Sequence, residues 1–181
     1  YDYARVSDNA QVYNYAWVRD YARVSDNAQV RDYAQVSGNA RVGGNAQVFD
    51  NAWVYDYARV SDNAQVYNNA QVFDNAQVHG DAWVRDNAQV YNYAQVYDYA
   101  RVSNNAQVYN YAQVRGDAQV SGNARVSDNA RVSDNARVSG DVWQADAERK
   151  AAAAAADPVS AVAHEVITKE FEKRSVLRLE E

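Results

Sequence analysis

The sequence predicts an all-β solenoid, in which short strands and corners alternate along a rod. The first observation is the period: Ala recurs every six residues from Ala4 to Ala136, and Val every six residues from Val6 to Val138. The second is that Asp, Asn and Gly, which favour turns, recur between these pairs. The third is that Leu and Ile are almost absent, so that Val and Ala must fill the core. A fixed short period of this kind indicates coils that stack on copies of themselves.

Each six-residue phrase divides into a strand and a corner. With the positions numbered one to six as in SDNARV (Ser127 to Val132), positions four and six are always Ala and Val in the regular phrases. Residues two apart on a strand point to the same side, so Ala and Val face inward, and positions five and one face solvent. Position two is Asp, Asn or Gly and never β-branched. Those residues tolerate left-handed backbone angles, so position two is expected at the corner.

The order Val-x-x-x-Ala-x, as in Val126 to Arg131, resembles the hexapeptide repeat of left-handed parallel β-helices. The resemblance covers residues 1–144. It implies three phrases per coil, hence coils of 18 residues, a triangular cross-section and a left hand. The 24 phrases then make about eight coils. The corners carry no insertions, and the chain thereby resembles synthetic consensus β-solenoids. We therefore expect a designed structural scaffold.

Residues 145–181 differ in composition and are expected to form a linker and a C-terminal α-helical cap on the solenoid. Asp157 suits the N-cap position and Pro158 the first helical position. Apolar residues then recur at three- and four-residue spacing, which predicts an amphipathic helix. They are Val159, Val162, Ala163, Val166, Ile167 and Phe171. The expected division is therefore 1–144 and 145–181.

Composition argues against several classes of partner. The formal net charge is −6, which disfavours nucleic-acid binding. No apolar run is long enough to span a membrane, and no targeting signal opens the chain. There is no Cys, so disulfides and thiolate metal sites are excluded. We expect a soluble protein of unassigned compartment, suited to recombinant cytoplasmic expression, without a cofactor or a small-molecule substrate.

Two enzyme classes are built on this fold, and neither is well supported. Hexapeptide acyltransferases use a His as general base beside a protruding loop, whereas His79 is the solenoid's single His and has no loop around it. γ-Carbonic anhydrases need three His ligands for zinc. The remaining His164 is expected on the solvent side of the C-terminal helix. No catalytic, cofactor-binding or metal-binding residue is therefore predicted, and a degenerate enzyme of either class is a remote alternative.

Other uses of a flat solenoid face are also disfavoured. Ice-binding members of this fold rely on Thr ladders, and the only Thr is Thr168, outside the repeat. Asp ladders at the corners could bind cations weakly, but Asn and Gly interrupt them. The abundance of Asp is better explained as a corner preference.

Outward aromatic and Arg residues recur at 18-residue spacing. Tyr91 should stack on Tyr109, and Tyr93 on Tyr111, while Trp17 and Trp53 lie two coils apart in one column. Such ladders can stabilise the rod, mediate self-association or bind a ligand. The column Arg5, Arg23, Arg41 and Arg59 places like charges on adjacent strands. We expect neighbouring Asp and Tyr residues to offset that repulsion, and a phosphate-binding role is a less favoured alternative.

The alternative to a scaffold is a self-assembling or binding module. It would use the Tyr, Trp and Arg ladders or the N-terminal coil, which lacks an evident cap and would leave a sheet edge open to a homodimer or end-to-end assembly. The candidate self-association surface consists of Tyr1, Tyr3, Tyr13, Tyr15 and Trp17.

Overall fold

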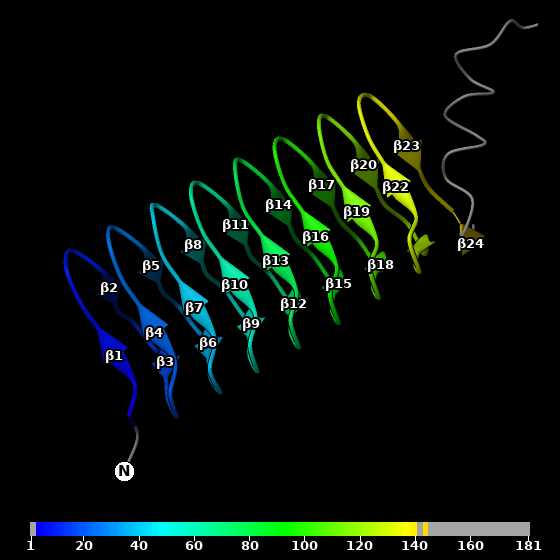
Figure 1. Cartoon of the computed structure of the whole chain (residues 1–181). Helices are drawn as coiled ribbons and strands as arrows, with labels where there is room; N and C mark the ends of the chain where they lie inside the picture. The colour runs from blue at the N-terminus through cyan, green and yellow to red at the C-terminus, as the bar shows by residue number, and fades with distance from the viewer. Residues whose placement is uncertain (1–2, 141–142, 145–181) are drawn as a thin grey trace, which may run out of the picture. The chain divides into compact units, whose positions relative to one another are not determined.

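The computed structural model describes residues 3–140 and 143–144, which lie within one compact unit, Tyr1–Ala145. The described residues form three parallel sheets of eight strands each, and no helix occurs among them. Each strand pairs with the strand three places further along the chain, so successive coils lie side by side along one axis (Figure 1). The prediction of an all-β parallel solenoid is confirmed.

Every strand is two residues long and has the position-five and position-six residues of a phrase. The first sheet contains β1 (Arg5–Val6), β4 (Arg23–Val24), β7 (Arg41–Val42), β10 (Arg59–Val60), β13 (Gln77–Val78), β16 (Gln95–Val96), β19 (Gln113–Val114) and β22 (Arg131–Val132). The second sheet contains β2 (Gln11–Val12), β5 (Gln29–Val30), β8 (Gln47–Val48), β11 (Gln65–Val66), β14 (Trp83–Val84), β17 (Arg101–Val102), β20 (Gln119–Val120) and β23 (Arg137–Val138). The third sheet contains β3 (Trp17–Val18), β6 (Gln35–Val36), β9 (Trp53–Val54), β12 (Gln71–Val72), β15 (Gln89–Val90), β18 (Gln107–Val108), β21 (Arg125–Val126) and β24 (Trp143–Gln144).

The register sets the length of a coil. Val66 pairs with Val84 on one side and with Val48 on the other, so partners are 18 residues apart. Three strands therefore make one coil, as expected, and the eight strands per sheet agree with about eight coils. The left hand of the coil stays a prediction.

Backbone hydrogen bonds extend each short strand into the corner that follows. The Arg59 amide donates to the Ala76 carbonyl at 2.9 Å, the Ser61 amide to Val78 at 3.0 Å, and the Asn63 amide to Gly80 at 2.9 Å. Each phrase is thus joined to the next coil along most of its length. Because the bonds hold equivalent residues in register, outward side chains are arranged in straight columns along the rod.

The core consists of Val and Ala alone, as the sequence predicts. These residues are buried almost without exception from Ala22 to Val132. In the first coil Val6 is 49% exposed, because only one side of that coil faces a described neighbour. Each interior coil thus depends on the coils on both sides of it to cover its apolar residues.

The residue at position two of each phrase determines the backbone conformation of the corner. Every position-two residue from Asp8 to Gly140 has a positive φ, between 56° and 63° for Asp and Asn and between 64° and 86° for Gly. That is the left-handed region, which β-branched residues avoid and Asn, Asp and Gly tolerate. The predicted corner chemistry is confirmed at every one of these positions.

The expected C-terminal helix, its N-cap at Asp157 and the helical cap over 145–181 lie outside the described residues. The division into 1–144 and 145–181 stays a prediction.

Candidate functional site: side-chain ladders along the rod

Aromatic rings stack from coil to coil on the outer surface. Ring centroids of neighbours lie 4.8–5.2 Å apart and the ring planes are within 3–8° of parallel. The stacked pairs of the described residues are Tyr3–Tyr21, Tyr15–Tyr33, Phe49–Tyr67, Tyr55–Phe73, Phe73–Tyr91, His79–Tyr97, Tyr91–Tyr109 and Tyr93–Tyr111. The two stacks expected from sequence, Tyr91 on Tyr109 and Tyr93 on Tyr111, are confirmed.

The longest ladder joins four coils through Tyr55, Phe73, Tyr91 and Tyr109. Its members are half-buried, because each ring covers the face of the next. Burial raises the pKa of the Tyr55 hydroxyl, and the carboxylates of Asp56 and Asp74 act in the same direction. Burial also raises the pKa of Tyr91. A ring inside such a ladder presents its edge and hydroxyl to solvent, while its faces are used in stacking.

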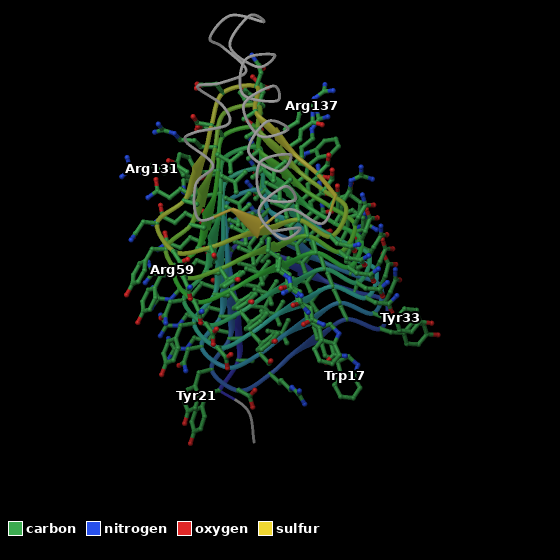
Figure 2. The ribbon with its side chains drawn as sticks, turned by 90° about the vertical axis from the view of Figure 1, so that its right-hand side faces the viewer. Trp17, Tyr21, Tyr33, Arg59, Arg131 and Arg137 are labelled. Carbon is green, nitrogen blue, oxygen red and sulfur yellow. The ribbon has the colours of Figure 1, made fainter. Side chains whose placement is uncertain are left out.

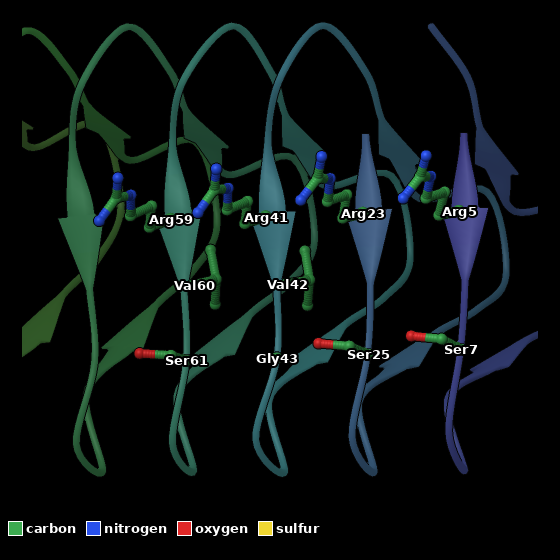
Figure 3. Close-up of a pocket in the computed structure, with 10 residues that line it drawn as sticks. All are labelled: Arg5, Ser7, Arg23, Ser25, Arg41, Val42, Gly43, Arg59, Val60 and Ser61. Atoms are coloured by element: carbon green, nitrogen blue, oxygen red, sulfur yellow. The ribbon is translucent and has the colours of Figure 1, made fainter. Parts of the chain in front are cut away.

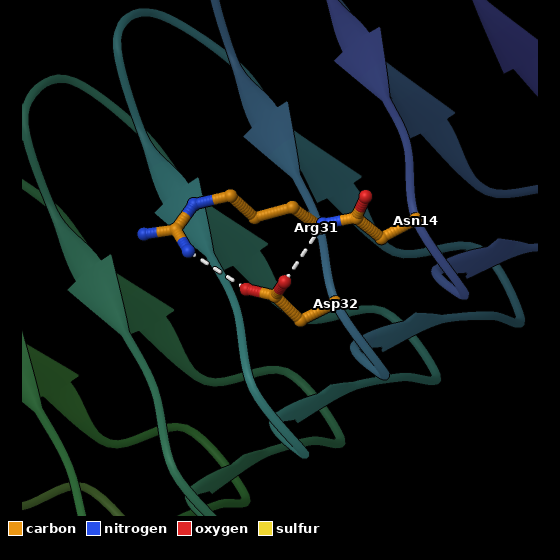
Figure 4. Close-up of polar contacts among 3 residues, drawn as sticks. All are labelled: Asn14, Arg31 and Asp32. Carbon is orange, nitrogen blue, oxygen red and sulfur yellow. Dashed lines mark hydrogen bonds and ion pairs between the residues drawn. The ribbon is translucent and has the colours of Figure 1, made fainter.

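A second set of contacts joins four coils at one corner, and Figure 4 shows its first three members, Asn14, Arg31 and Asp32. The Asn14 amide donates to Asp32 at 2.8 Å, and the Arg31 guanidinium donates to the other oxygen of that carboxylate at 2.7 Å. The Asn14 hydrogen bond holds the pKa of Asp32 below its ordinary value, with help from Arg31 and against partial desolvation. The Arg31 guanidinium also lies 4.1 Å above the centre of the Phe49 ring, which in turn stacks on Tyr67.

Amide side chains form ladders at the corners. Asn9 donates to Asn27, Asn27 to Asn45, Asn45 to Asn63 and Asn63 to Asp81, at 3.0–3.2 Å. A similar series joins Asn69, Asn87, Asn105 and Asn123. Each amide can donate to one neighbour while its oxygen accepts from the other, so a column of identical Asn residues satisfies itself. Sequence reasoning missed these ladders, although the 18-residue spacing of Asn was a usable signal.

Corner carboxylates bind backbone amides of the next coil. Asp26 accepts from the Gly44 amide at 2.9 Å, Asp62 from Gly80 at 3.0 Å and Asp98 from Gly116 at 3.2 Å. The carboxylates thereby link adjacent coils. This supports the expectation that Asp is a corner residue.

Five segments of the chain match the family described as YdcK Beta solenoid repeat. They are residues 34–48, 64–80, 94–110, 118–132 and 130–144. The chain is a β-solenoid repeat protein. A comparison with curated proteins found no match.

The candidate self-association surface of the β-solenoid is distributed over two corners. Tyr13, Tyr15 and Trp17 follow one another on the outer side of the corner that leads into β3, and all three are exposed. Tyr3 lies at a different corner and stacks on Tyr21. Tyr21 is the stacking partner of Tyr3, and Tyr33 that of Tyr15. Figure 2 shows Tyr21 and Tyr33 on opposite sides of the view, with Trp17 between them. Tyr1 lies outside the described residues.

Trp17 and Trp53 occupy one column of the third sheet, as expected, with Gln35 between them. Their rings are therefore separated by one whole coil and do not stack on each other. Both are exposed.

The histidines do not form a recognisable catalytic group in the described part of the β-solenoid. The His79 ring stacks on Tyr97 at 5.1 Å, and its Nδ1 lies 3.9 Å from the Asp62 carboxylate, which is too long for a hydrogen bond. His164 lies outside the described residues. No group of three or more His, Cys, Asp or Glu side chains suited to a metal ion occurs in residues 3–140.

Residues 3–140 and 143–144 contain no helix long and apolar enough to cross a membrane.

The predicted arginine column is present. Arg5, Arg23, Arg41 and Arg59 are direct strand partners in the first sheet. The expected pairing with neighbouring Asp side chains is not found, because the ion pairs within residues 3–140 involve other side chains. The corner carboxylates Asp8 and Asp26 instead accept from the hydroxyls of Ser7 and Ser25 beside them, and Asp26 also accepts from the Gly44 amide of the next coil.

Proposed function

We propose that this β-solenoid is a structural scaffold: a rigid rod that holds outward side chains at fixed spacing and has no catalytic activity of its own. The observation that supports this most directly is the regularity of the register, in which strands pair 18 residues apart throughout the described coils. Eight stacked strands at about 4.8 Å give a rod on the order of 35 Å long. Position-five and position-one side chains differ from coil to coil without disturbing that register.

The regular positions of the phrase are those that make the fold, and the variable positions are those that face solvent. If the chain is a scaffold, outward residues are interchangeable. We expect a variant with Gln47→Arg, Gln71→Arg and Gln95→Arg, none of which is a strand partner of another arginine, to keep the thermal unfolding midpoint of the parent within a few degrees. A large loss of stability or cooperativity would show that the outward residues have a more specific role.

The proposed absence of catalytic activity is tested by assaying both the parent chain and the variant His79→Ala. Acyl transfer from a thioester donor and hydration of CO2 are the two reactions to assay, because the resemblance of the repeat implies them. The expected result is no turnover above the buffer blank for either protein. Turnover that depends on His79 would contradict the proposal.

We further propose that the coil is left-handed and that the sequence originates from consensus design. Both rest on the near-identity of the phrases and on the resemblance of the repeat to the hexapeptide family. Interchangeable sides predict that exchanging the phrases Ser61–Val66 and Tyr67–Val72 keeps the cooperative unfolding transition and costs no more than the Phe49–Tyr67 stack that the exchange removes, about 0.5–1.5 kcal/mol. An experimental structure of the chain decides the hand.

A second candidate function is self-assembly through the first coil. Among the described residues, β1, β2 and β3 have a strand partner on one side only, and Val6 is half exposed. A cavity of about 620 Å³ at this end is lined by Val6, Ala10, Gln11, Val12 and Tyr13. Apolar side chains and unpaired strand edges together favour association with a second copy.

The mass of the chain in solution, measured over a range of concentrations, tests self-assembly. We expect a concentration-dependent dimer that Trp17→Gln or Val6→Lys weakens. Trp53→Gln is the matched control, since it changes the same residue type in the same column inside the rod. A strict monomer at every concentration would rule this function out.

A further inference from the structure

The arginine column borders a groove on the outside of the first sheet. The groove has a volume of about 550 Å³, and its lining includes Arg5, Arg23, Arg41 and Arg59. Figure 3 shows the four guanidinium groups extending in the same direction from successive strands. Ser7, Ser25, Gly43 and Ser61 form a second row beside them. The groove therefore exists where four arginines in one column lie beside four small residues in the next.

The same two columns change character further along the rod. After Arg59 the first column continues with Gln77, Gln95 and Gln113. After Ser61 the second column continues with His79 and Tyr97, whose rings stack. The groove therefore ends where Gln77 and the His79 ring follow Arg59 and Ser61, although an arginine recurs in the first column at Arg131.

The guanidinium charges of the groove are unpaired within the described residues. Strands in a sheet lie about 4.8 Å apart, so each guanidinium has a like charge close to it on an adjacent strand. Like charges directly opposite each other destabilise a sheet. Since none of the ion pairs within residues 3–140 involves these four arginines, the repulsion is not offset there by a carboxylate in contact.

The nearby carboxylates already have donors. Asp8 accepts from the Ser7 hydroxyl at 3.1 Å and lies 3.4 Å from the Asp26 amide. Asp26 accepts from Ser25 at 3.1 Å and from the Gly44 amide at 2.9 Å. Asp62 accepts from the Gly80 amide.

At the preceding corner, Asp20 accepts from the Gly38 amide at 3.1 Å and lies 4.0 Å from Arg19. Asp56 is the other described carboxylate of that corner in these coils, and it is not among the ion pairs of residues 3–140. The charges of the groove that lack partners are therefore mainly positive, although the whole chain is acidic.

We infer that this groove is a binding site for a linear chain of phosphate groups, of which inorganic polyphosphate is the simplest. Guanidinium groups bind phosphate oxygens through paired hydrogen bonds. Four of them in line span roughly 14 Å, so a single phosphate reaches one or two and only an extended polyanion reaches all four. Binding would relieve the repulsion along the column, which no described carboxylate does.

A phosphate chain fits this groove better than a nucleic acid does. Proteins that bind single-stranded nucleic acid offer aromatic ring faces to the bases. The tyrosines two residues before Arg5 and Arg23, at the corner that leads into these strands, are Tyr3 and Tyr21, and these rings stack on each other. The second wall of the groove is Ser and Gly, which leaves room for compact tetrahedral groups and offers no stacking surface.

Binding is tested with long-chain inorganic polyphosphate added to the chain, followed by calorimetry at several salt concentrations. We expect saturable binding that weakens as salt rises, because charge pairing at a surface is screened. The double variant Arg23→Gln and Arg41→Gln introduces the residue found further along the same column. It should lose roughly tenfold in affinity per arginine, the equivalent of a charge-assisted hydrogen bond.

The matched control is the double variant Arg131→Gln and Arg137→Gln, which removes the same charge outside the groove (Figure 2). It should bind polyphosphate within about twofold of the parent, a change far below one charge-assisted hydrogen bond. Equal losses in the two double variants would show a diffuse charge effect and would overturn the proposal. The absence of binding by the parent at physiological salt would also overturn it.

A variant that keeps every charge tests the groove itself. Ser61→Tyr places in the column a ring of the kind that Tyr97 already contributes. It should narrow the groove and weaken polyphosphate binding, while thermal unfolding shows that the rod is intact. Unchanged affinity in Ser61→Tyr would contradict a groove site. Tighter binding of a single-stranded oligonucleotide or of heparin than of polyphosphate, at equal charge, would overturn the assignment of the ligand.

Discussion

The ring of Tyr91 lies flat against the ring of Tyr109, with centroids 5.0 Å apart and planes 4° from parallel, although the two residues are 18 positions apart in the chain. The contact exists because Gln89 pairs with Gln107 in the strands that precede these tyrosines. A shift of one of these strands by one residue would turn its own ring to the inward side and break the stack. Ring stacking and strand register therefore support each other.

Removing either ring of the Tyr91–Tyr109 pair should lower the free energy of unfolding more than removing the ring of an unstacked tyrosine. We expect a coupling free energy of about 0.5–1.5 kcal/mol in a double-mutant cycle of Tyr91→Ala and Tyr109→Ala. Urea unfolding of the four proteins measures it. The control cycle uses Tyr57→Ala and Tyr99→Ala, exposed tyrosines outside the stacked pairs, whose effects should add. Additive effects at Tyr91 and Tyr109 would mean that the stack contributes nothing beyond burial.

A charge in the core should unfold the rod. Val66 is fully buried in β11 and pairs with Val48 and Val84. Val66→Asp would bury a carboxylate without a partner, which costs several kcal/mol. We expect loss of the cooperative transition in thermal unfolding followed by circular dichroism. Gln65→Asp, one residue away and on the outward side, should melt close to the parent; a parent-like melt of Val66→Asp would contradict the inward position of Val.

The left-handed corners should reject β-branched residues. Asn104 has a φ of 61°, and its backbone amide donates to Asp86 at 3.2 Å. Asn104→Ile keeps that amide but places a branched side chain in an unfavourable region, at a cost of about 1–2 kcal/mol. Asn104→Gly should be tolerated, since Gly adopts this conformation freely. Chemical denaturation ranks the two variants, and equal stability would show that the corner is not under this constraint.

Alkaline pH should weaken the tyrosine ladder. The pKa values of Tyr55 and Tyr91 are raised by burial, so the folded chain retains these protons when the unfolded chain, with ordinary values near 10, loses them. The stability that depends on the protonated rings is complete below about pH 10 and is lost as pH rises through the folded-state values. Urea midpoints measured from about pH 8 upward should fall in the parent and fall less in the double variant Tyr55→Phe and Tyr91→Phe. Identical slopes would show that these hydroxyls do not contribute.

Much of the fold could be predicted because its determinants are local. Two residues of each phrase, such as Ala64 and Val66, determine the inward side of the strand. One residue, such as Asp62, determines the corner. The stacking of Tyr91 on Tyr109 was predictable once the coil was taken as 18 residues. That number came from the resemblance to a known repeat, since a six-residue period is the same for coils of any number of phrases.

The arginine groove could not be predicted in this way, although its column was. Whether Asp26 pairs with Arg23 or with Gly44 depends on distances across the corner, and the structure places its carboxylate on the Gly44 amide. The Arg31 side chain, unlike that of Arg23, does bind a carboxylate: it donates to Asp32 and also lies above the Phe49 ring. Asp26, three residues after Arg23, and Asp32, directly after Arg31, are both position-two carboxylates near an arginine, but only Asp32 binds it.

The sequence by itself determined the repeat, the inward Val and Ala, the corner residues and the columns that follow from an 18-residue coil. These features depend on the properties of one six-residue phrase, and that phrase is repeated with little change. The tertiary structure alone decided which rings become half-buried, which carboxylates are used by backbone amides and where four guanidiniums remain unpaired beside a groove. Those outcomes depend on side chains from different coils meeting within a few ångströms, and no single phrase contains that information.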